Sequence, residues 1–161
     1  RSVRVRRDWL KGSARFQVEG RRAVAVVPVK GRAAAFLDDE GVVFPAPEGV
    51  YSGLSVDVEP GRAERARLKD LAGYLRSVAG PGALPAPLRR MRFVSEEEGW
   101  EAFLEDGTRV LWGQLDWTDE KLSRLREVLR DARTRFGGVL TADLRYFEDG
   151  KVLLRLPEKG S

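Results

Sequence analysis

The stretch TRVLWGQLDWTDEKLSRLREVLRDARTRFGGVLTADLRYF, residues 108–147, decides the fold. It opens and closes with apolar, β-prone runs at 108–113 and 139–147, which are typical of strands. Between them, apolar residues recur every three or four positions over 118–138, which predicts an amphipathic helix. The apolar stripe of this helix, expected to face the core, is Leu122, Leu125, Val128, Leu129, Ala132 and Phe136. Because both connections are short, we expect a strand–helix–strand crossover with two parallel strands.

A second helix and four turns complete the expected architecture. Residues 61–80 also show helical spacing, and a Gly-Pro-Gly sequence at 80–82 ends the run. Four segments set acidic residues and a glycine between apolar runs, which predicts hairpins because a tight turn favours a residue with positive φ. These segments are VEGRR (18–22), LDDEGVV (37–43), LEDGTRV (104–110) and FEDGKVL (147–153). The expected fold is α+β: a mixed, mainly antiparallel sheet with two helices packed on one face.

The closing segment TADLRYFEDGKVLLRL, residues 141–156, reads as two strands joined by a tight turn. Alternation divides the first strand into two faces, with Leu140, Ala142, Leu144 and Tyr146 on one and Thr141, Asp143, Arg145 and Phe147 on the other. The pleat places Tyr146 beside Leu144 on the core-facing side, yet both faces end in an aromatic ring. Alternation alone therefore leaves open which ring enters the core. A terminal hairpin is also a candidate sheet edge, which proteins cover or use for strand addition by a partner.

The composition excludes several classes of enzyme. No histidine and no cysteine occur, and Cys/His zinc sites, cysteine nucleophiles, Ser-His-Asp triads and haem sites each need one of them unless a partner subunit supplies it. The carboxylate clusters at 38–40 and 96–98 lie at an expected turn and just before an expected strand, where acidic residues favour turn geometry and solubility over catalysis. No glycine-rich phosphate-binding motif is present. We therefore predict no enzymatic activity, no metal and no cofactor.

The charge balance leaves a second class of function open. The chain carries 29 basic and 25 acidic residues, a formal net charge of +4 and a pI of about 9.7. A basic pI is compatible with nucleic acid or anionic membrane as a partner, although interleaved charges are more typical of a solvated surface. The alternating RRMRF segment at 89–93 fits an RNA-stacking strand, and it equally fits a strand with Met91 and Phe93 inward.

The chain itself is not expected to cross a membrane, because it has no run of about 18 apolar residues. It begins at Arg1 without a methionine, within an expected strand at 2–8. Two further strands are expected at 14–19 and 23–29, before a change in composition near 28–32. We expect the chain to be part of a longer protein whose upstream segment carries any signal or anchor.

The ordered set of features resembles one family, the bacterial cell-division proteins FtsQ/DivIB. The resemblance runs along essentially the whole chain, through AAFLDDEGVVFP (34–45), WEAFLEDGTRVLWGQ (100–114), KLSRLREVLRDA (121–132) and ADLRYFEDGKVLLR (142–155). Its most specific pieces are the hairpin from Asp106-Gly107 to Gly113 and the DLRY sequence from Asp143 to Tyr146.

The resemblance implies a domain organisation. Family members have a cytoplasmic tail, one membrane-spanning helix, a POTRA domain and a β domain. By this likeness, residues 1–30 correspond to the closing strands of a POTRA domain, 31–158 to the β domain and 159–161 to a tail. The full-length protein is then expected to be a single-pass protein whose domains lie on the extracytoplasmic face of the cell membrane, at the division septum.

The resemblance also implies a function without catalysis. The family acts as a divisome scaffold that binds the division proteins FtsB and FtsL and helps control septal peptidoglycan synthesis. Its last strands and the preceding helix accept a segment of FtsB by strand addition. The partner-binding residues predicted for this chain are Arg145, Tyr146, Phe147, Lys151 and Val152. The alternative, suggested by the basic pI, is a nucleic-acid-binding domain.

Overall fold

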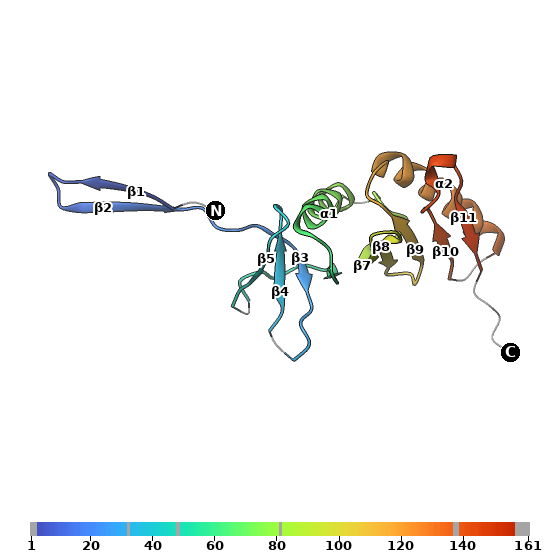
Figure 1. Cartoon of the computed structure of the whole chain (residues 1–161), viewed down its shortest axis with the longest axis horizontal. Coiled ribbons are helices and arrows are strands. Elements are labelled where there is room, and N and C mark those ends of the chain that lie inside the picture. Colours follow the sequence, from blue (N-terminus) through green and yellow to red (C-terminus); the bar gives the residue numbers. More distant parts are fainter. Residues whose placement is uncertain (1–2, 32, 48, 81, 137–138, 157–161) are drawn as a thin grey trace.

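A nine-stranded mixed sheet forms the body of the molecule (Figure 1). The computed structural model describes residues 3–31, 33–47, 49–80, 82–136 and 139–156. In spatial order the strands are β11 (Leu153–Arg155), β10 (Thr141–Asp143), β9 (Arg109–Gly113), β8 (Gly99–Leu104), β7 (Leu88–Ser95), β6 (Asp57–Glu59), β3 (Ala23–Val27), β4 (Ala35–Asp38) and β5 (Val43–Pro45). The pairs β10–β9, β6–β7 and β3–β6 are parallel, and the other five are antiparallel. The predicted mixed, mainly antiparallel sheet is confirmed.

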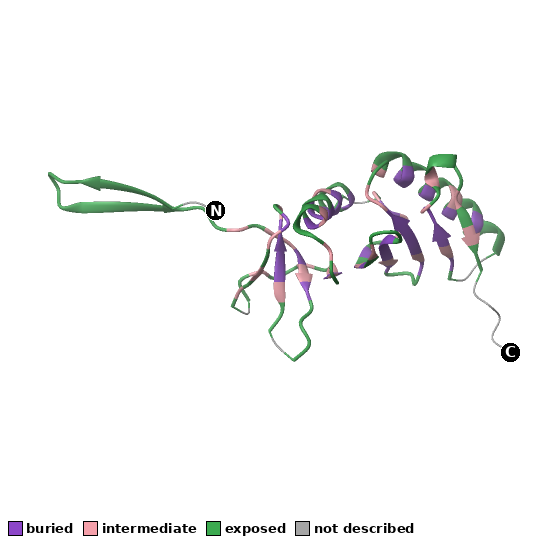
Figure 2. Cartoon of the chain, in the orientation of Figure 1, coloured by how far each residue is buried: buried purple, intermediate pink, exposed green. Residues whose placement is uncertain are grey.

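Two helices cover one face of this sheet. They are α1 (Arg65–Val78) and α2 (Thr118–Phe136). Figure 2 shows buried positions on both helices and on the central strands, and these residues belong to one hydrophobic core. Trp112 of β9 packs against Tyr74 of α1 at a centroid distance of 4.9 Å. The fully buried Ala142 of β10 lies in register with Val110, two residues before Trp112 and on the same face.

The opposite face of the sheet carries charged side chains. Glu101 of β8 accepts hydrogen bonds from Arg92 on β7 and Arg109 on β9, and both arginines remain partly exposed. Arg92, Glu101 and Arg109 each lie next in sequence to residues of the shared core, namely Met91, Phe93, Trp100, Ala102 and Val110, so their side chains point to the opposite face. This face therefore has an ionic ladder in place of a second helical layer.

The predicted crossover is also present. The chain passes from β9 through α2 to β10, and the two strands are parallel with Arg109 opposite Thr141 and Leu111 opposite Asp143. The second strand is shorter than predicted, because it ends at Asp143 and not at Phe147. The backbone N–H of Leu144 donates one more bond to the carbonyl of Leu111, at 2.8 Å, and the chain then leaves the sheet.

The first two strands stand apart from the sheet. β1 (Val3–Asp8) and β2 (Ser13–Val18) form an antiparallel hairpin that projects from the body, and all twelve of their residues are exposed (Figures 1 and 2). β3 pairs with β4 and β6 inside the main sheet, so strand pairing changes before β3 and not at residue 30.

The POTRA and β-domain assignments stay predictions, and the expected tail at 159–161 lies outside the described residues. Within those residues, no helix has the length and apolarity needed to cross a membrane.

Candidate partner-binding site

One edge of the sheet is open beside α2. Strand β11 pairs with β10 on one side and is the last strand of the sheet on the other. Its Leu153 and Arg155 are exposed, whereas Leu154 points toward the helix-covered side and packs against the core. An edge strand carries a row of backbone N–H and C=O groups that no neighbouring strand uses. This edge is therefore able to accept another extended segment.

A groove runs between this edge and α2. Its volume is about 380 Å³. The apolar residues that line it are Val128, Ala132, Phe136 and Leu154, and the charged ones are Arg124, Glu127, Asp131 and Arg135. Phe136 was predicted as part of the core stripe, but its side chain is 60% exposed, so that prediction is wrong. Phe136 is the last residue of α2, and it is exposed whereas the other residues of the predicted stripe are buried or partly buried.

The DLRY segment forms the loop that leads into β11. Tyr146 is 64% exposed, whereas Phe147 is partly buried and packs against the core. Alternation left open which of the two rings enters the core, and the structure places Phe147 there and Tyr146 at the surface, although the pleat favoured Tyr146 beside Leu144. Because the strand ends at Asp143, the two-residue period no longer applies at Tyr146. A single 3₁₀ turn, Phe147–Asp149, and the left-handed Gly150 then reverse the chain, as the predicted turn requires.

Arg145 is held by carboxylates of its own chain. Its Nε and Nη2 donate to the two oxygens of Asp143 at 2.9 and 2.6 Å, and its Nη1 donates to Glu98. The backbone N–H of Arg145 also donates to Asp143, at 3.1 Å. A bidentate arginine–carboxylate pair is among the stronger and more directional polar contacts in proteins. The guanidinium of Arg145 thus lies against the ring of Tyr146, 5.8 Å from its centroid, and is already hydrogen-bonded to Asp143 and Glu98.

The electrostatics of this pair agree with its geometry. Burial raises the pKa of Asp143, but the hydrogen bonds from Arg145 outweigh burial, so the pKa lies below its usual range. The same hydrogen bond raises the pKa of Arg145. Asp143 is 2% exposed, so it is a buried anion with its counter-ion beside it.

Two glycines let the loop approach the sheet. Gly113 ends β9 with φ of 76°, and a Cβ added there would lie 3.2 Å from the Cα of Arg145. A Cβ at Gly99, where φ is 68°, would overlap the carbonyl group of Gly113. Positive φ and close packing both favour glycine. The glycine that ends the predicted 106–113 motif therefore has a structural reason: it makes room for Arg145.

The cations available at the edge are Arg155 and Lys151. The side chain of Arg155 is 64% exposed and lies 3.6 Å from Asp143, and that of Lys151 is 71% exposed and lies 3.7 Å from Asp149. Lys151 was predicted as a site residue, whereas Arg155 and the groove residues of α2 were not. Val152, also predicted, packs its side chain against the core. The structure thus brings Tyr146, Lys151 and Arg155 to the surface and places Phe147 and Val152 beneath it.

The predicted carboxylate clusters have structural roles. Asp38 is buried and accepts the backbone N–H groups of Glu40 and Val42 at 2.9 and 2.8 Å, with Arg21 as its ion-pair partner. In the second cluster, Glu96 pairs with Arg67 and Glu98 with Arg145. In the described part of the chain, no three acidic, histidine or cysteine side chains are grouped to hold a metal ion.

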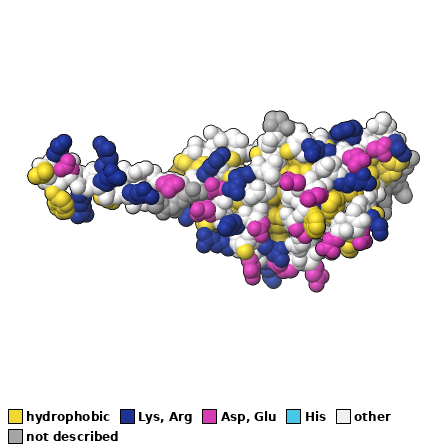
Figure 3. All heavy atoms as spheres, turned by 90° about the horizontal axis from the view of Figure 1, so that it is seen from above, with side chains coloured by type: hydrophobic (Ala, Val, Ile, Leu, Met, Phe, Trp, Pro, Cys, Tyr) yellow, Lys and Arg dark blue, Asp and Glu magenta, His cyan; other side chains and the backbone are white. Residues whose placement is uncertain are grey.

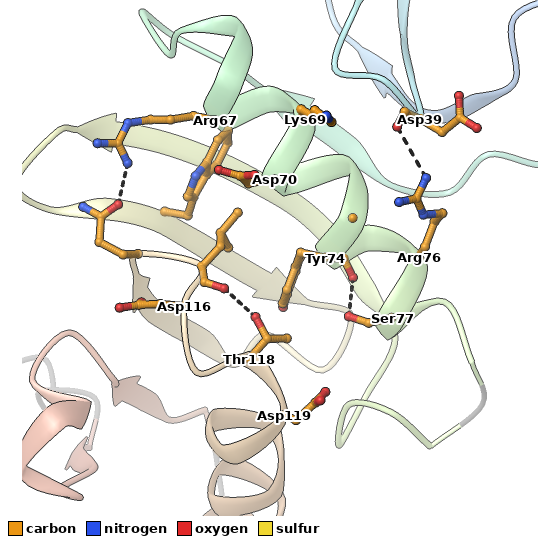
Figure 4. A pocket seen from close by; sticks show the side chains of 14 residues that line it. Asp39, Arg67, Lys69, Asp70, Tyr74, Arg76, Ser77, Asp116, Thr118 and Asp119 are labelled. Carbon is orange, nitrogen blue, oxygen red and sulfur yellow. Dashed lines mark hydrogen bonds between the residues drawn. The ribbon is translucent and has the colours of Figure 1, made fainter.

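A larger cavity of about 770 Å³ lies between α1 and the start of α2 (Figure 4). Arg67 on its wall donates to Gln114 at 2.6 Å, and Arg76 donates to the carbonyl of Asp39 at 3.4 Å. The hydroxyl of Tyr74 is buried, and burial raises its pKa, so the group is neutral. A neutral phenol is a poor general base. Tyr74 is therefore poorly suited to act as a general base in this cavity.

Comparison with known proteins gives one finding. The family model described as "Cell division protein FtsQ/DivIB, C-terminal" matches residues 25–145, three quarters of the chain. The match begins in β3, includes both helices, and ends at Arg145, just before Tyr146 and β11. Curated protein sequences gave no match.

Proposed function

The chain belongs to the FtsQ/DivIB family of cell-division proteins, and on this premise we propose that its open sheet edge binds a segment of FtsB by strand addition. The family acts in cell division as a membrane-anchored scaffold with an extracytoplasmic domain. We infer that this chain binds FtsB together with FtsL at the division septum and so helps control septal peptidoglycan synthesis. In this proposal the chain holds partners and catalyses no reaction.

The observation that carries the proposal is the open edge of β11 beside a groove that both apolar and charged side chains line. An added strand would take its main-chain hydrogen bonds from β11, which supplies affinity with little dependence on sequence. Its side chains would alternate between the two faces of the sheet. Those on the side of Leu154 would enter the groove toward Phe136, and those on the other side would lie beside Arg155. The expected partner segment therefore alternates apolar residues with polar ones that include a carboxylate.

Tyr146 is the proposed aromatic anchor at the start of this edge. Tyrosine is one of the residue types that are enriched among the residues that dominate binding energy at interfaces. Its support is Arg145, which is fixed by Asp143 and Glu98. Arg145 is then a positioning residue, and Lys151 and Arg155 are the cations that face a partner carboxylate. Phe147 and Val152 hold the turn against the core.

Calorimetric titration with a peptide that spans the FtsB segment tests the proposal. We expect Tyr146→Ala to weaken binding by about 2 kcal/mol, close to thirtyfold, with an unchanged melting temperature. Arg155→Glu is expected to weaken it further at low salt, because the edge then repels a carboxylate. Trp9→Ala is a matched control, since Trp9 is an exposed aromatic directly after β1, and the β1–β2 hairpin lies far from β11. If neither Tyr146→Ala nor Arg155→Glu changes the affinity, the site is wrongly assigned.

A second experiment separates strand addition from docking of another kind. Backbone N-methylation of the peptide removes one N–H at a time and keeps the side chains. For an added strand, methylation at every second residue should abolish binding, and methylation at the intervening residues should have little effect. Uniform tolerance of N-methylation would contradict strand addition while leaving partner binding intact.

A further inference from the structure

We propose that the β1–β2 hairpin binds an anionic lipid surface through its basic face and its apolar tip. This site lies at the end of the molecule remote from β11, so it is independent of the proposed partner edge (Figure 1). Figure 3 shows Lys and Arg side chains along the hairpin and hydrophobic side chains at its far end.

The strand register gathers arginines on one face of the hairpin. Arg6 lies directly opposite Arg15, and Arg4 lies opposite Gln17 on the same face. All four residues are exposed. Two like charges directly opposite each other destabilise a strand pair. An anionic surface would relieve this repulsion, since each guanidinium would then face a phosphate.

The tip adds apolar side chains to this basic face. A four-residue turn, 9–12, joins the strands, and within it Trp9 is 82% exposed and Leu10 is fully exposed. The guanidinium of Arg7 lies 5.7 Å from the ring centroid of Trp9, and Lys11 follows in the same turn. Tryptophan prefers the membrane–water interface, where its ring is buried and its N–H stays hydrated.

The charge of the whole chain is concentrated in this region. Residues 1–18 contain six basic residues and one acidic residue, Asp8, which gives +5. The whole chain has a formal net charge of +4, so the other residues together carry −1. The basic pI is therefore a property of the hairpin, and the body of the molecule is close to neutral.

A lipid surface fits this combination better than a nucleic acid or an acidic protein segment. Interfacial segments join lysine and arginine to exposed Trp and Leu, because the cations meet headgroups while the apolar side chains enter the acyl boundary. A nucleic acid offers no apolar phase for Leu10. Val5 and Phe16 lie on the other face of the hairpin and take no part in lipid binding through the arginines. Lipid binding is therefore compatible with another segment packed against Val5 and Phe16.

Vesicle co-sedimentation of the full chain tests the proposal. Vesicles of equal parts phosphatidylglycerol and phosphatidylcholine should bind the chain, and vesicles of phosphatidylcholine alone should not. Each cation near an anionic surface contributes about fivefold in affinity, so Arg6→Glu/Arg15→Glu should weaken binding by about twenty-five-fold or more. Trp9→Ser/Leu10→Ser should weaken it at least about tenfold, because the apolar contact is lost. Circular dichroism should show an unchanged fold, since all four side chains are exposed.

The matched control is Arg62→Glu/Arg65→Glu, which changes the net charge equally at exposed positions before and within α1. Retained vesicle binding in this variant supports a hairpin site, and an equal loss overturns it. Equal binding to both kinds of vesicle, or tighter binding to a short single-stranded or double-stranded DNA than to anionic vesicles, also overturns the proposal. Titration with the FtsB peptide should be unaffected by the hairpin variants, so failure here leaves the partner edge untouched.

Discussion

Two antiparallel hairpins at opposite ends of the molecule differ in what surrounds them. β1–β2 has six-residue strands, and every one of their residues is exposed. β10–β11 has strands of three residues, yet Ala142 and Asp143 are buried, because β10 pairs with β9, Ala142 belongs to the core on the helix-covered face, and Asp143 on the other face is bound by Arg145. Strand length therefore does not decide which hairpin is packed into the body of the molecule. Packing against neighbouring elements decides it, since a lone two-stranded hairpin is only marginally stable in water.

The difference extends to how each hairpin presents its side chains. Beside β10–β11, a buried ion pair holds Arg145, and the glycines at the ends of the neighbouring strands, Gly113 of β9 and Gly99 of β8, are closely packed, Gly113 against Arg145 and Gly99 against Gly113. In β1–β2 the turn glycine, Gly12, has no atom within 4 Å of an added Cβ, and the charged residues face solvent. A rigid support suits recognition of one partner segment, whereas an exposed basic face suits a surface of uniform charge. The following substitutions test this contrast, beginning with the largest expected effect.

Substitution of the packed glycine should have the largest effect. Gly99→Ala should lower the free energy of unfolding by about 4 kcal/mol, because the new Cβ overlaps the carbonyl of Gly113 and φ stays positive. Gly12→Ala, also at positive φ but in open space, should leave the main unfolding transition unchanged. Urea denaturation measures both. Equal effects of the two substitutions would contradict the contrast between the close packing beside β10–β11 and the open β1–β2 hairpin.

Substitution of the buried carboxylate of Asp143 should cause the second-largest loss of stability. Asp143→Ala should cost about 3 kcal/mol, because it leaves Arg145 without its bidentate partner in a partly buried position. It should also weaken FtsB-peptide binding, since Tyr146 loses its support. Asp8→Ala in the exposed hairpin should change stability by less than about 0.5 kcal/mol. Thermal denaturation and titration of the two variants provide the comparison.

The same carboxylate should make stability depend on pH in acid. Burial raises the pKa of Asp143 and the hydrogen bonds from Arg145 lower it more, so the folded-state pKa lies below the unfolded value of about 3.9. The unfolded chain therefore takes up the proton first, and the stabilisation is present above that value and lost as pH falls through the folded-state pKa. Asp143→Ala should flatten, but not remove, the acid slope, because Asp38 and Glu101 also have lowered pKa values. An unchanged slope in urea titrations at several pH values would argue against this ion pair.

The smallest effect is expected in the groove. Phe136→Ala should change stability by no more than about 0.5 kcal/mol, because the side chain is largely exposed, and should weaken peptide binding by about 1 kcal/mol. Phe16→Ala in the first hairpin removes an equally exposed phenylalanine and should leave peptide binding unchanged. Loss of stability without loss of affinity would place Phe136 in the core, as its helical spacing first suggested.

The sequence predicted those parts of the fold that depend on local periodicity. The α2 crossover and the turn at Gly150 follow from spacing and from the need for positive φ, and both are present. Periodicity does not predict where a strand ends when a side chain accepts a hydrogen bond from a backbone N–H that would otherwise continue the strand pairing. Asp143 accepts the N–H of Arg145, and this local bond accompanies the end of β10 that alternation did not predict.

Pairing between strands that are distant in the sequence was the second feature that the sequence did not predict. β6 has three residues and no distinctive pattern, yet it joins β3 to β7 and so brings β3 into the main sheet. In the site, Tyr146 was found through resemblance, whereas the groove residues depend on how far the sheet extends beneath α2. Helical spacing identifies a face but not the point at which its neighbour ends, so Phe136 was assigned to the core.

The shortness of the sheet edges bears on aggregation. β11 at one edge and β5 at the other each have three residues, and β5 ends at Pro45, which has no N–H to donate. Self-templating cross-β assembly draws on segments of about six or seven residues without proline. Each of these two edges is too short to nucleate such growth, so the nine-stranded sheet can leave β11 unpaired without templating strand addition by its own copies.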